Sequence, residues 1–290
     1  MGMADSDEPT ELVWFATGSS SGLGREIVRR AAEAGDRVVA TARRPEALAD
    51  LVAAHPALVT SAALDVTDPE QIREAVDSAL RQFGRIDVLV NNAGYGLRGA
   101  VEAWEMEQLR RLFETNFFGA VEVTRAVLPS MRAAGRGWIV QMSSVAGFRS
   151  GLGSSAYSAS KFALEGLSEG LGREVHPFGI DVTLVEPGPF RTDFSGRSHD
   201  WAEHPAYVEV FAEEFEAYQA RSGRQPNDPA RAADILVSLA HGNRQQRPWR
   251  LPLGPEAFDI ARRTFDRRRR ELDEVEALGR DTAFDDDSPV

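Results

Sequence analysis

Short apolar runs alternate with amphipathic segments along most of this chain. Between the runs, segments such as residues 70–83 and 107–134 repeat their apolar positions with a helical period of about 3.6 residues. Runs that are apolar at nearly every position are typical of strands covered on both faces, and their alternation with helices indicates a parallel sheet between helical layers. The pattern predicts an α/β fold whose strands are Leu12 to Ala16, Arg37 to Ala42, Leu58 to Val66, Ile86 to Val90, Trp138 to Met142, Ile180 to Val185 and Trp249 to Leu253.

A single domain is expected over residues 11–280. A chain of 290 residues with 42% hydrophobic content can bury one sizeable core, and neither a linker nor a solenoid repeat interrupts the alternation. Residues 1–10 and 281–290 are polar and acidic, so they are predicted to form flexible tails.

Composition and charge narrow the function. The chain has no cysteine, which excludes disulfides, thiolate metal sites and a cysteine nucleophile. A net charge of −12 argues against a nucleic-acid-binding or anionic-membrane surface. Without an apolar run near the length of about 18 residues that a membrane helix needs, or a signal segment, we expect a cytoplasmic protein.

The first apolar run leads into a glycine-rich turn, Thr17–Gly24, and a helical pattern follows it. In that context, free backbone N–H groups at the start of the helix can bind a pyrophosphate. The spacing Gly-xxx-Gly-x-Gly differs from the usual Gly-x-Gly-xx-Gly fingerprint, and the Lys-Ser/Thr ending of a P-loop is missing. The candidate phosphate-binding residues are Gly18, Ser20, Ser21, Gly22, Leu23 and Gly24.

Lys161 is the only lysine among the 33 basic residues, and it follows Tyr157 by four positions. Residues four apart share one face of a helix, so the phenol and the ammonium are expected to lie close together. A lysine ammonium is a compact donor on a flexible stem, a role that an arginine fork cannot fill.

Taken together, these motifs resemble the classical short-chain dehydrogenase/reductase family over about residues 12–255, nearest in appearance to its hydroxysteroid and retinol dehydrogenase-like branch. The resemblance implies a doubly wound Rossmann-type parallel sheet of about seven strands, with a nicotinamide cofactor across the carboxyl ends of the strands. It also implies a substrate lid at about residues 192–228. The matching motifs are Thr17–Gly24, Asp65-Val66, Asn91–Gly94, Asn116, Ser143-Ser144, Tyr157 with Lys161, and Pro187-Gly188 with Thr192.

The resemblance implies four catalytic residues. Tyr157 would exchange a proton with the substrate oxygen, and Ser144 would hydrogen-bond that oxygen. Lys161 would bind the nicotinamide ribose, and Asn116 would hold a water that links the lysine to solvent. An ammonium about 4 Å from the phenol contributes about 4 kcal/mol at an effective dielectric of about 20, so the phenol's pKa is expected to fall below its usual value of about 10.

The cofactor contacts follow from the same resemblance. Asp65 and Val66 would contact the adenine, and Thr192 would bond the carboxamide. Ala42 stands where enzymes selecting NAD carry an acid, and Arg43 follows it, so NADP(H) is favoured over NAD(H). The other implied cofactor-binding residues are Asn92, Ala93, Gly94, Pro187 and Gly188, together with Tyr157 and Lys161.

The predicted function is an NADP(H)-dependent oxidoreductase that interconverts a ketone or aldehyde and the corresponding alcohol. Two alternatives are a noncatalytic NADP(H)-binding regulatory or scaffold protein, and an epimerase or dehydratase of the extended branch, which normally has a larger substrate domain. A homodimer or homotetramer is expected to form through the helices at residues 107–134 and 157–176.

The predicted lid is rich in aromatic residues. They would form an apolar site for a lipophilic alcohol or carbonyl substrate, although ordinary helix packing has the same pattern. His199 and His204 lack an evident third ligand, so no metal is expected. The aromatic residues are Phe194, Trp201, Tyr207, Phe211, Phe215 and Tyr218, with Phe148 and Tyr95 from elsewhere in the chain.

Overall fold

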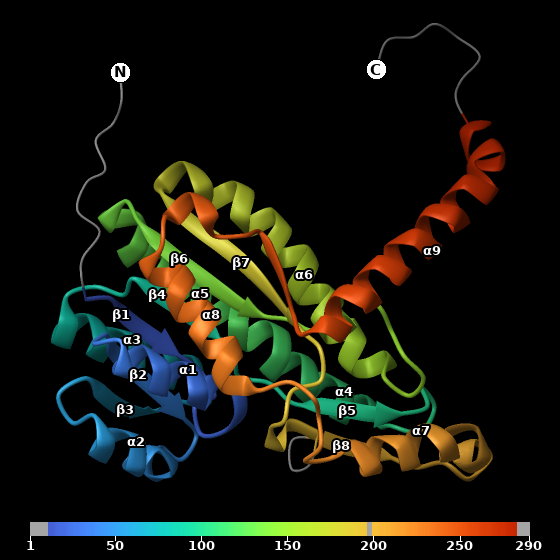
Figure 1. Cartoon of the computed structure of the whole chain (residues 1–290), viewed down its shortest axis with the longest axis horizontal. Coiled ribbons are helices and arrows are strands. Elements are labelled where there is room, and N and C mark those ends of the chain that lie inside the picture. Colours follow the sequence, from blue (N-terminus) through green and yellow to red (C-terminus); the bar gives the residue numbers. More distant parts are fainter. Residues whose placement is uncertain (1–10, 196–198, 283–290) are drawn as a thin grey trace, which may run out of the picture.

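The computed structural model describes residues 11–195 and 199–282, and the predicted tail at 1–10 and most of that at 281–290 lie outside these residues. Its centre is a seven-stranded parallel sheet in the order β3-β2-β1-β4-β6-β7-β9 (Figure 1). The α/β prediction with about seven strands is therefore confirmed. The strands are β1 (Val13–Ala16), β2 (Arg37–Ala42), β3 (Val59–Ala63), β4 (Val88–Asn91), β6 (Gly137–Met142), β7 (Ile180–Pro187) and β9 (Arg250–Leu253).

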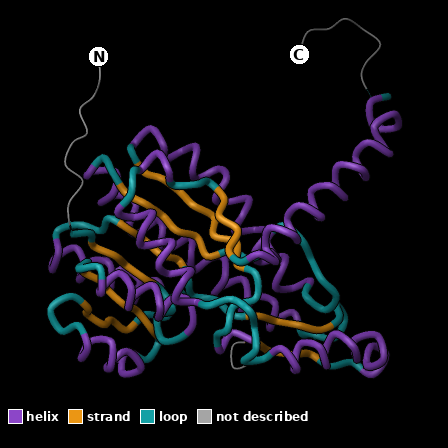
Figure 2. The backbone as a smooth tube through the Cα atoms, viewed as in Figure 1, coloured by secondary structure: helices purple, strands orange, loops and turns teal. Residues whose placement is uncertain are grey.

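Helices cover both faces of this sheet (Figure 2). One buried core joins the sheet to α1 (Gly22–Glu33), α2 (Ala49–Ala54) and α8 (Pro229–His241). A second core joins the opposite face to α3 (Pro69–Phe83), α5 (Gly119–Ala134) and α6 (Ser155–Val175). Two packed hydrophobic cores hold the strands in place, so residues at the strand ends are well positioned.

Local sequence explains where these helices begin and end, as α3 illustrates. The carboxylate of Asp68 accepts hydrogen bonds from the backbone N–H groups of Glu70 and Gln71, which caps the start of the helix. Gly84 ends it in the left-handed conformation, at φ 75°. Ile72 and Val76, four residues apart, lie on its buried face.

The direction in which strands are added reverses beside β1. The chain runs from β1 outward to β2 and β3, and then returns to β4 on the other side of β1. The backbone N–H of Thr17, after β1, donates to the carbonyl of Val90 in β4 across this junction, at 2.9 Å. In doubly wound sheets such a reversal opens the crevice that binds ligands.

A smaller unit lies beyond the carboxyl ends of the main strands. It contains a two-stranded parallel sheet of β5 (Gly96–Gly99) and β8 (His199–Ala202), covered by α7 (Val208–Arg221). The alternation of apolar runs did not predict these strands. The single helix predicted at residues 107–134 is also wrong in detail, because α4 (Met106–Phe113) is joined to α5 through a π-helical turn, Glu114–Phe118.

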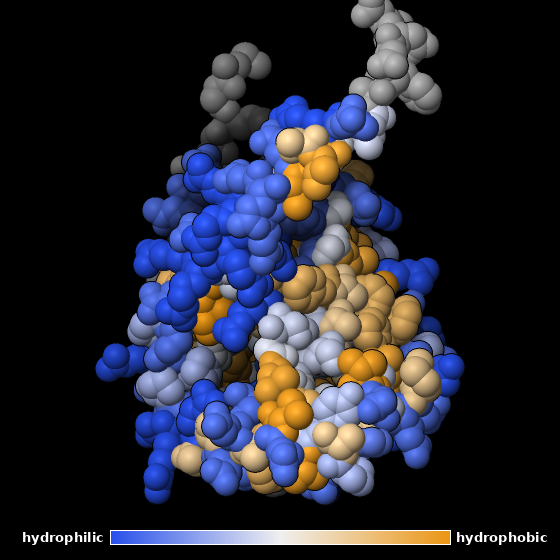
Figure 3. Space-filling model, turned by 90° about the vertical axis from the view of Figure 1, so that its right-hand side faces the viewer, coloured by the Kyte–Doolittle hydropathy of each residue, from blue (hydrophilic) through white to orange (hydrophobic). Residues whose placement is uncertain are grey.

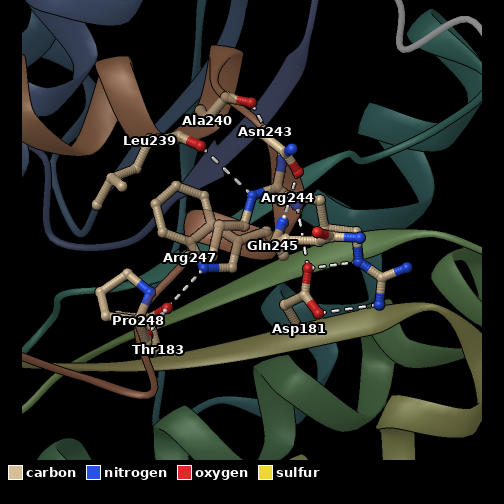
Figure 4. Close-up of polar contacts among 10 residues, drawn as sticks. Asp181, Thr183, Leu239, Ala240, Asn243, Arg244, Gln245, Arg247 and Pro248 are labelled. Carbon is tan, nitrogen blue, oxygen red and sulfur yellow. Dashed lines mark hydrogen bonds and ion pairs between the residues drawn. The ribbon is translucent and has the colours of Figure 1, made fainter. Parts of the chain in front are cut away.

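A polar cluster fixes the connection between α8 and β9 to the main sheet (Figure 4). The guanidinium of Arg244 donates twice to the carboxylate of Asp181 in β7, at 2.6 and 2.9 Å. Arg247 donates to the carbonyl of Ala240 at 3.0 Å and lies over the ring of Trp138. Arg247 thus provides a donor to a free carbonyl at the end of α8, and the Arg244–Asp181 pair holds the segment before β9 against β7.

The last helix, α9 (Pro255–Arg280), begins at the end of β9 and extends away from the domain (Figure 1). Apolar surface is visible beside it in the space-filling view (Figure 3). Among the described residues, no helix is long and apolar enough to cross a membrane.

Candidate active site

The glycine-rich turn after β1 exposes the start of α1. Gly18 and Gly22 have φ angles of 66° and 60°, which favour glycine. Ser21 precedes the helix without a side-chain capping bond, and the first turn has no acidic residue. The first N–H groups of α1 are therefore available to an anion. Ser20 is exposed, Ser21 and Leu23 are partly buried, and Gly24 is buried against the loop.

Asn92 holds this loop to the end of β4. Its side-chain amide donates to the carbonyls of Thr17 and Gly18, both at 3.0 Å. The hydroxyl of Thr17 accepts in return from the backbone N–H groups of Asn92 and Ala93, also at 3.0 Å. A Cβ atom at Gly24 would lie only 2.3 Å from the Asn92 amide nitrogen. The role that these contacts give Asn92 is to shape the loop.

The predicted adenine and 2′-phosphate contacts lie after β2 and β3, which are neighbours in the sheet. The Asp65 carboxylate accepts from the backbone N–H and hydroxyl of Thr67, at 3.0 and 2.8 Å. Val66 is buried, and a Cβ atom at Gly119 would lie 2.7 Å from it. Arg43 is exposed at the end of β2, and no described residue forms a hydrogen bond or ion pair with it.

The segment after β7 returns to the glycine-rich turn. Pro187 ends β7, and the N–H of Gly188 donates to the carbonyl of Leu253 at 2.9 Å. A Cβ atom at Gly22 would lie 3.4 Å from the Cβ of Thr192. The structure thus brings the predicted carboxamide contact next to the start of α1.

Tyr157 and Ser144 lie together where α6 passes the end of β6. They form a side-chain hydrogen bond, and the Ser144 hydroxyl also accepts from the backbone N–H of Ala146 at 3.1 Å. Burial raises the pKa of Tyr157 to about 12, although Ser144 and the positive charge of Arg98 lower it. The expected fall in the phenol's pKa is wrong, because desolvation of the phenolate dominates.

Lys161 is buried on the same face of α6. Its ammonium lies 5.8 Å from the centroid of the Tyr157 ring and donates to the carbonyl of Met142 at 2.7 Å. Burial lowers the pKa of Lys161 to about 8, and the negative charge of Glu165 opposes that effect. The lysine therefore sits beneath the tyrosine ring but is directed toward the end of β6.

Asn116 lies in the π-helical turn and faces the same site. Its amide donates to the carbonyl of Tyr95 at 2.8 Å and to the Ser160 hydroxyl at 3.1 Å, and its oxygen accepts from the Tyr95 N–H at 3.0 Å. A Cβ atom at Gly94 would lie 3.0 Å from the Asn116 oxygen and 3.7 Å from the Lys161 ammonium. The four predicted catalytic side chains are thus brought together around Gly94 and the end of β6.

A buried acidic cluster beside these residues was not predicted. The hydroxyl of Ser143 donates to the carboxylate of Glu165, and Arg250 bridges Glu165 to Glu186 in β7. Burial and the neighbouring charge of Glu165 raise the pKa of Glu186 to about 7. This cluster could not be predicted from the sequence, because its members are far apart in the chain and charged residues usually lie on the surface.

The aromatic residues of the predicted substrate site fall into separate groups. Phe194 lies 5.8 Å from Tyr157 between ring centroids, at the candidate catalytic site. Phe148 instead packs on Phe265 of α9. The others surround Trp201: its centroid lies 6.5, 4.9 and 6.3 Å from those of Phe211, Phe215 and Tyr218, and Tyr207 stacks on Phe211. Tyr95 packs on a small separate core.

His204 caps a short turn by accepting from the backbone N–H of Ala206, and the side chain of His199 lies outside what the structure describes. No group of three or more His, Asp or Glu side chains in residues 11–195 and 199–282 is placed to hold a metal ion.

A sequence model described as short chain dehydrogenase matches residues 13–203. Retinol dehydrogenase 8 of Bos taurus is 43% identical over 188 residues, which cover 62% of this chain and 60% of that protein. The crystal structure of a short-chain dehydrogenase from Streptomyces avermitilis is 47% identical, with a TM-score of 0.88 over 94% of this chain and 100% of that one. A metagenomic short-chain oxidoreductase in complex with NADP is 29% identical, with a TM-score of 0.67 over 83% and 96% of the two chains.

Proposed function

The chain belongs to the short-chain dehydrogenase family of oxidoreductases, in its retinol dehydrogenase-like branch, and from that membership we propose that it interconverts a ketone or aldehyde with an alcohol, using NADP(H). The observation that carries this proposal is the convergence of Asn116, Ser144, Tyr157 and Lys161 beside the glycine-rich turn. Loss of Tyr157 or Lys161 would have favoured a noncatalytic protein.

The residues at the reversal of the sheet fit a dinucleotide. The uncapped start of α1 offers backbone donors to the pyrophosphate, and glycine at positions 18 and 22 keeps side chains away from it. Lys161 would hold the nicotinamide ribose and Thr192 the carboxamide. When bound, the cofactor supplies or accepts the hydride.

Tyr157 is the proton donor in the reducing direction. Because burial raises its pKa to about 12, the phenol is protonated near neutral pH and can give its proton to a carbonyl oxygen. Ser144, already hydrogen-bonded to the phenol, is placed to hold that oxygen. Asn116 and Lys161, both close to Gly94, would return a proton to the tyrosine by way of water.

The choice of NADP(H) rests on Arg43. Its exposed guanidinium follows the end of β2, next to Ala42 rather than an acid, and a guanidinium fork matches a 2′-phosphate. The NADP complex of a related short-chain oxidoreductase supports the same choice.

Titration with NADPH and NADH, followed by nicotinamide fluorescence, tests the cofactor. We expect tighter binding of NADPH, and Arg43→Asp should reduce that preference by about tenfold or more. Arg81→Asp, the same charge change at the far end of α3, is the matched control and should change neither affinity. Preference for NADH would contradict the role of Arg43 but would leave the proposed enzyme class standing.

Turnover separates an enzyme from a binding protein. The purified protein with its preferred cofactor should reduce members of a panel of apolar ketones and aldehydes. Tight cofactor binding without turnover of any of them would favour the noncatalytic alternative.

A further inference from the structure

Arg98 is a partly buried cation beside the candidate catalytic site. It lies in β5, where its register partner in β8 is Trp201. Its side chain is 17% exposed, and among the described residues no acceptor reaches the buried Nε and Nη1 nitrogens. Leaving buried guanidinium donors without acceptors costs free energy, so an acceptor supplied by a bound ligand would be stabilising here.

Two aromatic rings fix the position of this guanidinium. Its central carbon lies 4.2 Å from the centroid of the Tyr218 ring and 5.9 Å from that of Trp201. Rings hold an arginine by its flat face and leave its N–H edges free for planar acceptors. Tyr218 comes from α7, so the sheet and the helix together position Arg98.

The ion pair with Glu214 does not account for Arg98. The Nη1 of Arg98 lies 3.6 Å from the Glu214 carboxylate, beyond hydrogen-bond distance, and Arg221 lies 3.9 Å from the same oxygen. Among the ion pairs of the described residues, this one carboxylate thus faces two guanidinium groups. Glu214 is also more exposed than Arg98, so its charge is better screened by water.

The strand that bears Arg98 is tied to the loop before Tyr157. The N–H of Gly99 donates to the carbonyl of Gly153 at 3.0 Å, and Gly153 in turn approaches Phe211 of α7. The charge of Arg98 is close enough to lower the pKa of Tyr157. Arg98 and Tyr157 therefore lie on connected segments within electrostatic reach of each other, with aromatic rings beside each of them.

From this arrangement we propose that the substrate carries a carboxylate, which Arg98 binds while the reacting carbonyl or alcohol lies at Tyr157 and Ser144. The substrate class is a keto acid or hydroxy acid with an apolar body. This inference rests on the proposed function for its chemistry. The proposed substrate differs from the entirely lipophilic one expected from the sequence, because it has an apolar body and an anionic group at one end.

Matched substrates test the proposal. Phenyl ketones that carry a carboxylate two, three or four methylene groups from the carbonyl are compared with their methyl esters, using NADPH. For at least one chain length, kcat/KM for the acid should exceed that for the ester by about tenfold or more. In Arg98→Met this value should fall about 10- to 100-fold for the acid, mainly through KM, and stay within about twofold for the ester.

Two further variants separate recognition from folding. Arg98→Lys keeps the charge and should retain part of the preference for the acid. Arg221→Met removes the exposed cation that faces the same Glu214 carboxylate, and it should leave the preference unchanged. Equal use of acid and ester, with Arg98→Met lowering both alike, would overturn the proposal.

Binding without turnover distinguishes this proposal from the enzymatic one. Calorimetry with the phenylalkanoates of the same chain lengths should show binding that their amides lack and that Arg98→Met abolishes. Such binding in a protein that reduces no carbonyl would sustain the anion site and reject the enzymatic function. Reduction of neutral ketones with no binding of carboxylates would sustain the enzymatic function and reject the anion site.

Discussion

Desolvation governs the phenol of Tyr157 more than the neighbouring lysine does. Its surroundings raise the pKa to about 12, and the Lys161 ammonium is directed to the Met142 carbonyl. A protonated phenol hydrogen-bonded to Ser144 suits the proton donation that the proposed function requires.

Tyr157→Phe tests the proton donor directly. It removes the hydroxyl and keeps the ring that contacts Phe194, so kcat for carbonyl reduction should fall about 100- to 10,000-fold while the affinity for NADPH changes little. Stopped-flow turnover and cofactor titration measure the two quantities. Tyr95→Phe, which alters a partly buried tyrosine nearby, is the control, and near wild-type turnover in Tyr157→Phe would assign proton transfer to another group.

The joint between α6, β7 and β9 depends on an unbalanced ion cluster. Arg250, from β9, contacts Glu165 and Glu169 of α6 and Glu186 of β7. Three carboxylates share one guanidinium, and two of the three are buried. Burial and the charge of Glu165 therefore raise the pKa of Glu186 from 4.5 to about 7.

This shift makes stability depend on pH. Since the folded protein binds the Glu186 proton more tightly than the unfolded chain, the free energy of unfolding contributed by this group falls as pH rises from 4.5 to about 7. Glu186→Gln removes the titration and keeps an acceptor for Arg250, so urea unfolding should show a shallower decline over that range. Glu169→Gln, at a half-exposed partner of the same arginine, should keep the wild-type slope. Equal slopes in wild type and Glu186→Gln would contradict the raised pKa.

The elements differ in how far sequence could predict them. The main strands are continuous apolar runs, so β1, β2, β4, β6, β7 and β9 were predicted within about two residues. β5 has four residues with glycine at both ends, and β8 exists only because it pairs with β5. The motifs predicted which residues gather at the site, but not the direction of the Lys161 ammonium or the position of the partly buried Arg98 guanidinium, because both depend on packing between distant segments.

At the scale of the whole molecule, the far half of α9 is separate from the domain. Ala257, Ala261 and Thr264 are its buried residues, Phe265 packs on Phe148, and Arg268 donates to the Phe148 carbonyl at 2.6 Å. Every described residue after Thr264 is exposed, including Leu272 and Leu278. Ion pairs within the helix, such as Arg267 with Glu271 at 3.3 Å, support this half locally.

Truncation after Arg270 therefore removes no contact that stabilises the domain. The shortened protein should keep its NADPH-dependent turnover and a Tm within about 2 °C of the full chain, because surface changes away from packed contacts cost about 0.5 kcal/mol or less. Truncation after Gly254 also removes the buried alanines Ala257 and Ala261, and it should lower Tm by several times 2 °C. Calorimetry with light scattering provides both Tm and molar mass. A fall in molar mass after the shorter truncation would show instead that the exposed leucines of α9 join subunits, and would place the interface here rather than on α5 and α6.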